Sequence, residues 1–442
     1  MIEHSGAPSR FTYVGWSVDA IEGRVSCSYE LDGEAFTEIV GLEGGGDLSG
    51  EEAQQAARIL FLLAGVSYFK TKAPPVIDFG EHSLSAAECD LLTQLYRDGL
   101  AEFAYVNGLE LGNLELRATI EDDPQALAPL ATRGALVPFG GGIDSIVSVD
   151  VALIADDDPA LFVVSRPGDR FAAIEAAAEV TELEVLRAWR QIDPKMLDGV
   201  DRAYLNGHVP VTAIVSAIAV LVAAAHDRGP VVMSNERSAS VPAIIEGREV
   251  NHQWSKSWAF EQAFAKVLSQ RVPSVGYFSL LRPCSELWVA QRFAKLRAFH
   301  PYFRSCNRSF TLDPKRRMES WCGVCDKCAF IDLILAPFLS PAELSAIFDG
   351  AEPLENPQML AQFESLVGLG DQHKPLECVG DLDECIAAVI LAADREDRSA
   401  CTTLQALATR VPPRSAEELN QLLHPSGPQG IHRGFIDAAD LG

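Results

Sequence analysis

The sequence lacks the features of an exported or membrane-bound protein. A secretory signal begins with basic residues followed by an apolar core, and the N-terminal residues Met1 to His4 lack both features. The longest apolar stretch, residues 209–225, is short of a membrane span and contains Pro210 and Thr212, so we predict a buried helix there. Ten cysteines without an export signal indicate a reducing compartment. We therefore expect a cytoplasmic protein with no membrane partner.

Positive charge is also scarce. The 36 Lys and Arg residues face 62 Asp and Glu residues, which gives a formal net charge of -26. The averaged field repels phosphate backbones, so we expect no nucleic-acid partner and a small-molecule substrate instead. Internal repeats and low-complexity tracts are absent from the sequence, and 48% hydrophobic residues with 22% charged residues are typical of a folded enzyme. The sequence predicts no particular oligomeric state.

The length of 442 residues predicts two or three packed units. Residues 1–130 are expected to form an N-terminal α/β domain, because residues 25–31 alternate like a half-buried strand and residues 51–69 have helical spacing. Residues 131–300 would form a second α/β domain. Residues 301–442 would form a helical, cysteine-rich part, with a helix at 341–348 capped by Ser340.

The middle of the chain alternates β-rich and helical runs. This pattern predicts a parallel sheet with crossover helices, and hence the α/β fold class. The expected strands are 135–139, 161–165, 184–188, 230–234 and 275–281, and the expected helices are 145–154, 171–180 and 211–226.

A glycine-rich loop follows the first of these strands. Phe139 leads into Gly140, Gly141 and Gly142, and a helix then starts with Asp144 and Ser145. Glycines let consecutive backbone N–H groups converge on phosphate oxygens, and the helix N-terminus adds partial positive charge. The Ser145 hydroxyl can donate to the same phosphates. Asp144 would repel them unless Mg²⁺ bridges it to ATP or it caps the helix.

This loop fits neither of the two commoner nucleotide loops. It has no Gly-Lys-Ser/Thr of the Walker type and no G-x-G-x-x-G spacing. It resembles the Ser-Gly-Gly-x-Asp-Ser loop of the N-type (PP-loop) ATP pyrophosphatases, which implies that fold and the release of AMP or an adenylate. Gly140 stands where that family usually has Ser. The alternative is a turn followed by a helix cap.

Four cysteines form a second motif. Three lie at C-x-x-C-x-x-C spacing with one upstream, which predicts a closed and structural Zn²⁺ site made by Cys306, Cys322, Cys325 and Cys328. Trp321 and Phe330 could cover it. An iron–sulfur cluster or unliganded thiols are the alternatives. A similar arrangement follows the ATP loop in the cyano-deazaguanine synthases. The other cysteines are expected to be core or surface thiols: Cys27, Cys89, Cys284, Cys378, Cys385 and Cys401.

Polar side chains gather in three further segments, 206–212, 234–240 and 250–257. The second follows an expected strand, and ligand crevices in open α/β sheets lie at the carboxyl ends of strands. Glu236 could bind Mg²⁺ or move a proton. The alternative for each residue is a capping or ion-pair role. The expected substrate-binding residues are Asn206, Asn235, Arg237, Ser238 and Arg282.

Eight segments in consistent order resemble the bacterial UDP-N-acetylmuramoyl-L-alanyl-L-glutamate epimerase (MurL) family. They are PFGGGIDS, LNGHVPVTA, VVMSNERSAS, VNHQWSKS, YFSLLRPCSELWVAQ, SCNRSF, WCGVCDKCAF and KPLECVG, within residues 134–380. Ile143 departs, because relatives are expected to have Lys there.

The resemblance implies that the terminal L-Glu of UDP-MurNAc-L-Ala-L-Glu is inverted for peptidoglycan, through an acyl-adenylate made from ATP. His208, Glu236 and His252 are the candidate acid/base residues. The competing hypotheses are an amide synthetase, a tRNA thiolase and a non-catalytic ATP-binding zinc module.

Overall fold

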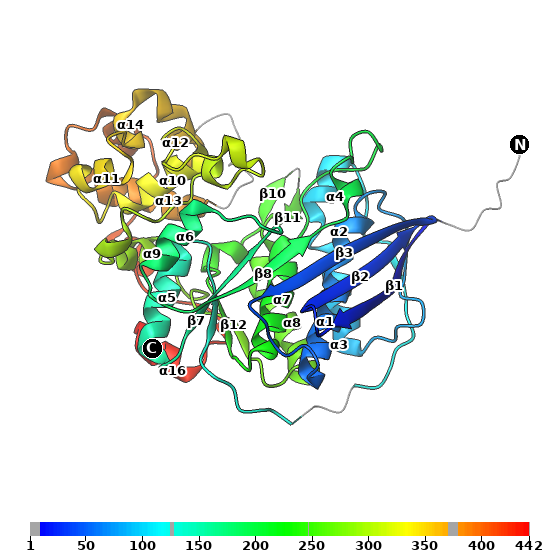
Figure 1. The fold of residues 1–442 in the computed structure, drawn as a ribbon. Coiled ribbons are helices and arrows are strands. Elements are labelled where there is room, and N and C mark those ends of the chain that lie inside the picture. The colour runs from blue at the N-terminus through cyan, green and yellow to red at the C-terminus, as the bar shows by residue number, and fades with distance from the viewer. Residues whose placement is uncertain (1–8, 124–127, 246, 370–378, 442) are drawn as a thin grey trace, which may run out of the picture.

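A ten-stranded sheet forms the centre of the molecule in the computed structural model, which describes residues 9–123, 128–245, 247–369 and 379–441 (Figure 1). The strand order is β12-β9-β6-β7-β8-β3-β2-β1-β4-β5. A separate hairpin joins β10 to β11. The strands are β1 (Arg10–Asp19), β2 (Arg24–Leu31), β3 (Glu34–Glu43), β4 (Val76–Asp78), β5 (Glu115–Arg117), β6 (Leu136–Pro138), β7 (Ala160–Ser165), β8 (Val185–Gln191), β9 (Val231–Met233), β10 (Ala243–Ile245), β11 (Arg248–Val250) and β12 (Tyr277–Ser279).

The sheet is mostly parallel, with an antiparallel stretch in the middle. Strands β12, β9, β6, β7 and β8 run parallel to one another. β3 pairs antiparallel with both β8 and β2, and β2 pairs antiparallel with β1. The N-terminal strands therefore continue the sheet of the central region through the β3–β8 pairing. The boundary expected near residue 130 thus falls within a region that one sheet spans, and the division into three domains stays a prediction.

Helices cover both faces of this sheet, because successive strand residues point to opposite sides. Leu136 faces one core and Val137 the other. The first core is closed by α1 (Glu51–Ala64), α2 (Val66–Phe69), α3 (Ala86–Arg97), α4 (Ala101–Asn107), α7 (Val211–Ala225) and α8 (Trp258–Arg271). The second core is closed by α5 (Ile143–Ala155), α6 (Ala172–Glu179), α9 (Glu286–Phe293) and α16 (Arg433–Ala439), among others.

The C-terminal part is helical and packs on the second core at the upper left of Figure 1. Ser340 caps α11 by accepting from the Glu343 N–H, while the Glu343 side chain accepts from the Ser340 N–H. This reciprocal cap confirms the helix start that the sequence predicts. The helices are α10 (Asp326–Leu335), α11 (Pro341–Ile347), α12 (Leu360–Leu366), α13 (Leu382–Ala393), α14 (Thr402–Ala408) and α15 (Ala416–Leu422).

All five strands and three helices expected in the central region are present, with β6, β9 and β12 each three residues long. The helix expected at residues 51–69 is divided at Gly65 into α1 and α2. A Cβ atom at Gly65 would lie 2.6 Å from the Tyr13 hydroxyl oxygen, so glycine lets β1 approach the break. No described helix is long and apolar enough to span a membrane.

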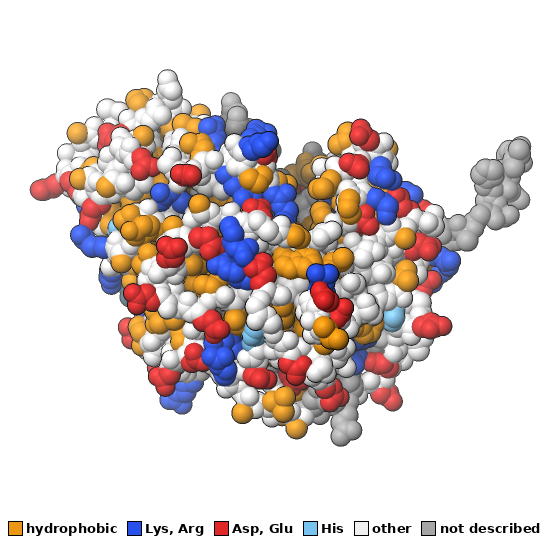
Figure 2. Space-filling model, viewed as in Figure 1, with side chains coloured by type: hydrophobic (Ala, Val, Ile, Leu, Met, Phe, Trp, Pro, Cys, Tyr) orange, Lys and Arg blue, Asp and Glu red, His pale blue; other side chains and the backbone are white. Residues whose placement is uncertain are grey.

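The carboxyl ends of β6, β9 and β12 lie at one edge of the sheet, because the three strands are parallel neighbours. Their following loops begin at Phe139, Ser234 and Leu280. In Figure 2 the surface is hollowed between the C-terminal helices and the region of α4 and the β10–β11 hairpin. Lys and Arg side chains gather on the side of the hollow next to the C-terminal helices (Figure 2).

Candidate active site

The glycine loop joins β6 to α5 in a conformation that depends on its central glycine. Gly141 has a φ of 72°, and a Cβ atom there would lie 3.0 Å from the Ala173 carbonyl oxygen. A Cβ atom at Gly140 would meet nothing within 4 Å. Packing therefore does not require glycine at position 140 and would leave room for a serine there. At position 141 the backbone conformation itself requires glycine.

A segment from the C-terminal part forms the second wall of this loop. The Arg304 N–H donates to the Gly141 carbonyl at 3.2 Å. A Cβ atom at Gly142 would lie 3.0 Å from the Ser305 Oγ. Ser305 thus places a hydroxyl beside the loop, whereas the loop residue Gly140 carries no hydroxyl of its own. Cys306 follows directly, so the segment that touches the loop is continuous with the cysteine cluster.

The two side chains that begin α5 differ in their environments. The Ser145 hydroxyl donates to the Gly142 carbonyl at 3.0 Å. The Oδ1 atom of Asp144 is buried and has no hydrogen-bond partner in the described structure. Burial, and secondarily the charge of Glu236, raises the pKa of Asp144 to about 7, against the opposing effect of Lys327 and Lys256. A buried carboxylate with an unused oxygen is suited to a cation that arrives with a nucleotide.

Further buried carboxyl groups lie near Asp144. Glu236 is 5% exposed and Glu286, at the first position of α9, is 6% exposed. Burial first, and then Asp144, Glu236 and Glu384, raises the pKa of Glu286 well above its ordinary range. Burial raises the pKa of Glu384 to about 8. This concentration of buried acids is stabilised when protons or cations reduce its negative charge.

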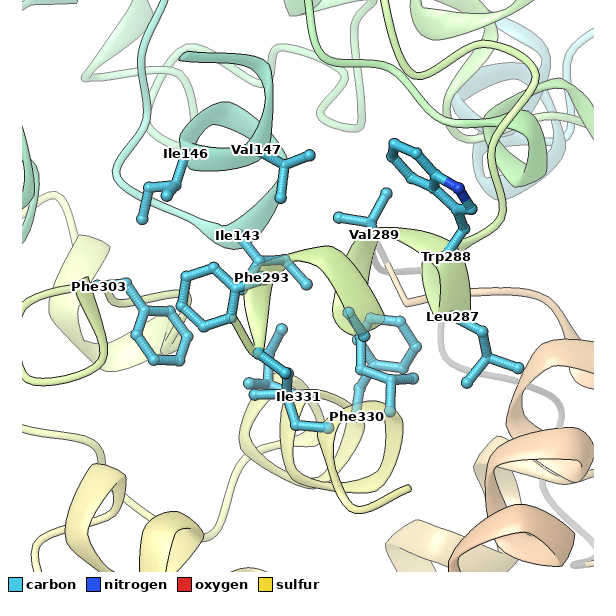
Figure 3. Packing of buried hydrophobic residues seen from close by; sticks show 14 of the residues in the cluster. Ile143, Ile146, Val147, Leu287, Trp288, Val289, Phe293, Phe303, Phe330 and Ile331 are labelled. Carbon is cyan, nitrogen blue, oxygen red and sulfur yellow. The ribbon is translucent and has the colours of Figure 1, made fainter. Parts of the chain in front are cut away.

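Position 143, where relatives are expected to have Lys, points away from the loop. Ile143 is 2% exposed and packs with the apolar side chains of α9 and α10, among them Phe293 (Figure 3). Its side chain anchors the start of α5 in the second core. An apolar side chain at position 143 therefore fits its packed surroundings.

The four predicted zinc ligands come together. Their sulfur atoms all lie within 4.8 Å of one another. The Cys328 Sγ lies 3.7 Å from that of Cys322 and 3.5 Å from that of Cys325. A tetrahedral zinc site with bonds of about 2.3 Å would separate its sulfurs by about 3.8 Å. The described spacing fits a single ion.

The flanking aromatic residues and the other cysteines lie as expected. Trp321 and Phe330 are buried beside the cluster. Cys27, Cys284, Cys385 and Cys401 are buried, and Cys89 is partly buried. Cys378 lies outside the described residues.

Arg282, for which substrate binding stays a prediction, connects two loops from within the protein. It is 2% exposed, and its Nε donates to Glu261 Oε2 at 3.0 Å. Its other nitrogens donate to the Glu236 carbonyl at 3.0 Å and the Lys256 carbonyl at 2.5 Å. Arg282 therefore fixes the loop after β9 against the segment of residues 250–257.

Asn235 and Ser238 also have internal partners. The Asn235 amide donates to Ser279 Oγ at 2.8 Å, which links the ends of β9 and β12. The Ser238 hydroxyl donates to Glu236 Oε1 at 3.0 Å and orients that carboxylate. Both side chains are buried, which favours the alternative of a structural role in this conformation.

Arg237 points to a different place from its neighbour Glu236. Its guanidinium donates to Ser426 Oγ at 2.6 Å and lines a cavity of about 450 Å³ with residues of the C-terminal part, including Arg414 and His424. The glycine loop does not line this cavity.

Two of the three predicted acid/base residues lie together. The ring centroids of His208 and His252 are 4.2 Å apart. The Nδ1 of His252 is hydrogen-bonded to Glu102 Oε2, from α4. Burial, and secondarily His252, lowers the pKa of His208 to about 4, so its imidazole is neutral near pH 7. A carboxylate that orients an imidazole through Nδ1 leaves Nε2 available for proton transfer.

The same three groups could hold a metal ion, because their ligand atoms lie within 4.8 Å of one another. Two cations argue against this. Lys256 and Lys70 are both close enough to His208 to lower its pKa. Positive charge beside the imidazoles disfavours a divalent cation and favours an anionic ligand, so the arrangement is better suited to proton transfer beside a carboxylate.

Lys256 links the two halves of the site. It lowers the pKa of Asp144 on the side of the glycine loop and that of His208 on the side of the two histidines. Its Nζ donates to Gln253 Oε1 at 3.1 Å, and its carbonyl is held by Arg282. The remaining predicted base, Glu236, lies on the side of the glycine loop, near Asp144.

The sequence patterns did not indicate Glu102, Glu286 or Lys256. Glu102 is 150 positions from its partner His252 and sits in an ordinary amphipathic helix. Glu286 follows the N-cap residue Ser285 in the first turn of α9, where an acidic residue is common for reasons of helix stability alone. Lys256 belongs to the polar segment 250–257, and only the contacts of the folded chain distinguish it from the other polar residues of that segment.

Two family models match the chain. The MurL N-terminal domain matches residues 3–280, and the MurL C-terminal domain matches residues 302–422. No solved structure matches the chain.

Three relatives are each named UDP-N-acetyl-alpha-D-muramoyl-L-alanyl-L-glutamate epimerase. The one from Xanthomonas oryzae pv. oryzae is 41% identical over 398 residues, covering 88% of this chain and 87% of the relative. Those from a Micromonospora species and Salinispora tropica are each 36% identical and cover 97% of this chain, and 97% and 95% of their own lengths.

Proposed function

The chain belongs to the MurL family of epimerases, which are isomerases, and we propose that it inverts the terminal L-Glu of UDP-MurNAc-L-Ala-L-Glu to D-Glu. The reaction uses ATP and water, releases AMP and diphosphate, and supplies D-Glu for peptidoglycan. The net charge of the protein is strongly negative and would repel anionic substrates such as ATP and the UDP-linked dipeptide. Local cations in the site must therefore bind them.

The chemistry explains why ATP is needed. The glutamate nitrogen is already an amide, so it cannot form the Schiff base with which pyridoxal phosphate acidifies an α-proton. Removing that proton beside an ionised carboxylate would build a dianion. In the proposed reaction the α-carboxylate oxygen attacks the α-phosphorus of ATP and diphosphate leaves. The acyl group of the resulting mixed anhydride no longer carries the carboxylate charge, so the neighbouring C–H is more acidic.

The glycine loop is proposed to hold the ATP phosphates. The backbone of Gly140, Gly141 and Gly142, the hydroxyl of Ser145 and the start of α5 form the cradle, behind Phe139. Ser305 Oγ offers a second hydroxyl beside the loop. Asp144, with Glu236 nearby, would hold Mg²⁺, which neutralises phosphate charge when it is bound.

His252 is proposed to remove the α-proton, with Glu102 stabilising the imidazolium that forms. His208 and His252 cannot lie on opposite faces of the α-carbon. Their ring centroids are 4.2 Å apart, whereas a group between two rings needs about 7 Å. The two imidazoles therefore serve one face. Return of a proton to the other face and attack of water on the anhydride complete the reaction.

The cysteine cluster is proposed to hold Zn²⁺ in a structural role. Four thiolates fill a tetrahedral site and leave no position for substrate. The bound ion would fix Cys306 and, with it, the segment at Arg304 and Ser305 that braces the glycine loop.

One observation carries the proposal most directly. Lys256 influences Asp144 in the nucleotide half and His208 in the histidine half. An acyl-adenylate must span the same interval, with its phosphate toward the glycine loop and its α-carbon toward a base. In the proposed reaction Lys256 would stabilise the negative charge that develops when the α-proton is removed.

The test is to incubate the protein with ATP, Mg²⁺ and UDP-MurNAc-L-Ala-L-Glu without any amine or sulfur source. After acid hydrolysis, chiral chromatography measures the configuration of glutamate, and AMP is quantified in parallel. D-Glu formed together with AMP supports the epimerase. AMP without D-Glu would retain adenylation and reject epimerisation. ATP binding without AMP would favour the non-catalytic module.

A further inference from the structure

The ammonium group of Lys70 is a partly buried cation without a carboxylate partner among the described residues. Its Nζ donates to the Gly207 carbonyl at 3.2 Å and lies 3.4 Å from Asn206 Oδ1, and both acceptors are neutral. Burial lowers the pKa of Lys70. A desolvated ammonium group with two neutral acceptors keeps capacity for an anion.

Hydrogen bonds connect the loop beside Lys70 to the rest of the fold. The loop before α7 is fixed by the Leu205 N–H, which donates to the Thr71 carbonyl at 2.9 Å. The Asn107 amide donates to the Asn206 carbonyl at 2.9 Å. Gly207, with a φ of 155°, lies against Phe103. Asn206, expected to bind substrate, uses its side-chain oxygen for Gly207 and Lys70.

This cation lies beside the histidine half of the site. Gly207, whose carbonyl accepts from Lys70, directly precedes His208 in the chain. Lys70 contributes to the electrostatic environment of His208 together with Lys256 and Glu102. Two cations therefore act on the imidazole of His208, and Lys256 is the one that also acts on Asp144 beside the glycine loop.

We propose that Lys70 binds the side-chain carboxylate of the substrate's terminal glutamate and so selects glutamate as the residue to be inverted. This inference rests on the proposed function. When the α-carboxylate is joined to AMP near Lys256, the side-chain carboxylate is the remaining carboxylate of the glutamate, and its anionic oxygens lie only four bonds from the α-carbon. Anchoring it at Lys70 directs the α-proton toward the histidines, because both anchors and the base then surround one carbon.

The charge at Lys70 also predicts selection against glutamine. A neutral amide in place of the carboxylate would leave the ammonium without a counter-ion and would lose a charge-assisted hydrogen bond. Discrimination of about 10- to 100-fold is expected from one such interaction.

The experiment compares two substrates, UDP-MurNAc-L-Ala-L-Glu and the isosteric UDP-MurNAc-L-Ala-L-Gln, with wild type, Lys70→Met and Lys70→Arg. For Lys70→Met we expect kcat/KM with the glutamate substrate to fall about 10- to 100-fold, while the value with the glutamine substrate stays within about 3-fold. Lys70→Arg should retain most of the preference. An equal fall for both substrates would overturn the proposal, because the anion bound would then be the diphosphate or another common group.

Lys72→Met is the matched control. Lys72 lies two residues away, has an exposed side chain and approaches Asp32 Oδ2 at 3.8 Å. It should leave both substrates unaffected, and thermal unfolding of all variants reports whether Lys70→Met folds.

A binding arm separates failure of this inference from failure of the proposed reaction. Saturation-transfer NMR compares the dipeptides L-Ala-L-Glu and L-Ala-L-Gln with wild type and Lys70→Met, without ATP. Preferential binding of the glutamate dipeptide that disappears in Lys70→Met supports the carboxylate site even when no D-Glu is formed. Absence of that preference in wild type rejects the site.

Discussion

Arg282 donates a hydrogen bond from its buried guanidinium to the backbone carbonyl of Lys256 at 2.5 Å. The same guanidinium binds the Glu236 carbonyl and pairs with the buried Glu261. A residue expected to contact substrate thus determines where two other candidate residues stand. Arg282 thereby connects the loop that carries Glu236 with the segment that carries Lys256.

Arg282→Met should destabilise the protein by about 3 kcal/mol, because it leaves Glu261 as a buried, unpaired carboxylate. Urea denaturation followed by circular dichroism measures this change. The double variant Arg282→Met with Glu261→Met should recover part of the loss, since the uncompensated charge is then absent. An unchanged urea midpoint for Arg282→Met would contradict a stabilising role of the Arg282 contacts.

Glu102→Gln should separate adenylation from epimerisation. Without the carboxylate the His252 imidazolium loses its stabilising partner, so we expect D-Glu formation to fall about 100-fold or more. AMP formation and exchange of labelled diphosphate into ATP should stay within a few-fold of wild type. Glu115→Gln, at an exposed carboxylate of β5, is the control and should leave both activities unchanged. Equal losses of both activities in Glu102→Gln would place this residue outside proton transfer.

Adjacent glycines of the loop should respond differently to alanine. Gly141→Ala forces a side chain into a φ of 72° with a contact of 3.0 Å to the Ala173 carbonyl, so a cost of about 1–3 kcal/mol and loss of AMP formation are expected. Gly140→Ala and Gly140→Ser meet open space and should retain stability. Melting temperature and the KM for ATP measure both effects. Comparable damage from the two alanine variants would show that the loop is misassigned.

The cysteine cluster should carry one zinc ion per chain, measured by mass spectrometry of the purified protein. Cys325→Ser should lower the zinc content and weaken ATP binding, because the ion fixes the segment that donates to Gly141. Cys89→Ser changes a thiol outside the cluster and should affect neither quantity. Iron in place of zinc, or full ATP affinity in the zinc-free variant, would count against the structural zinc role.

His208 should make the protein less stable in acid. Its pKa is lowered from 6.5 to about 4 in the folded state, mainly by burial. The unfolded chain therefore binds a proton at this residue between those pH values while the folded chain does not, so its contribution to stability is lost as pH falls from about 6.5 toward 4. His208→Gln should show a smaller decrease in melting temperature between pH 7 and pH 5 than wild type. Identical decreases would reject this assignment.

Local sequence features predicted the central fold well. Short β-rich runs alternate with helices from residue 135 to residue 281, and this pattern required only the period of each element and the turns between them. The strand–glycine–helix order at residues 136–145 similarly predicted the loop and the start of α5. The spacing of Cys322, Cys325 and Cys328 predicted a cluster, because residues so close in the chain need only one turn to converge.

The sequence by itself therefore determined the α/β alternation, the glycine loop, the cysteine cluster and the family resemblance, all of which depend on residues near one another in the chain. Only the tertiary structure decided that the N-terminal strands join the same sheet, that Arg282 faces Glu261, and that Glu102 meets His252. Those relationships connect residues far apart in the chain, and they form only when packing of the two cores brings separate loops to one edge of the sheet.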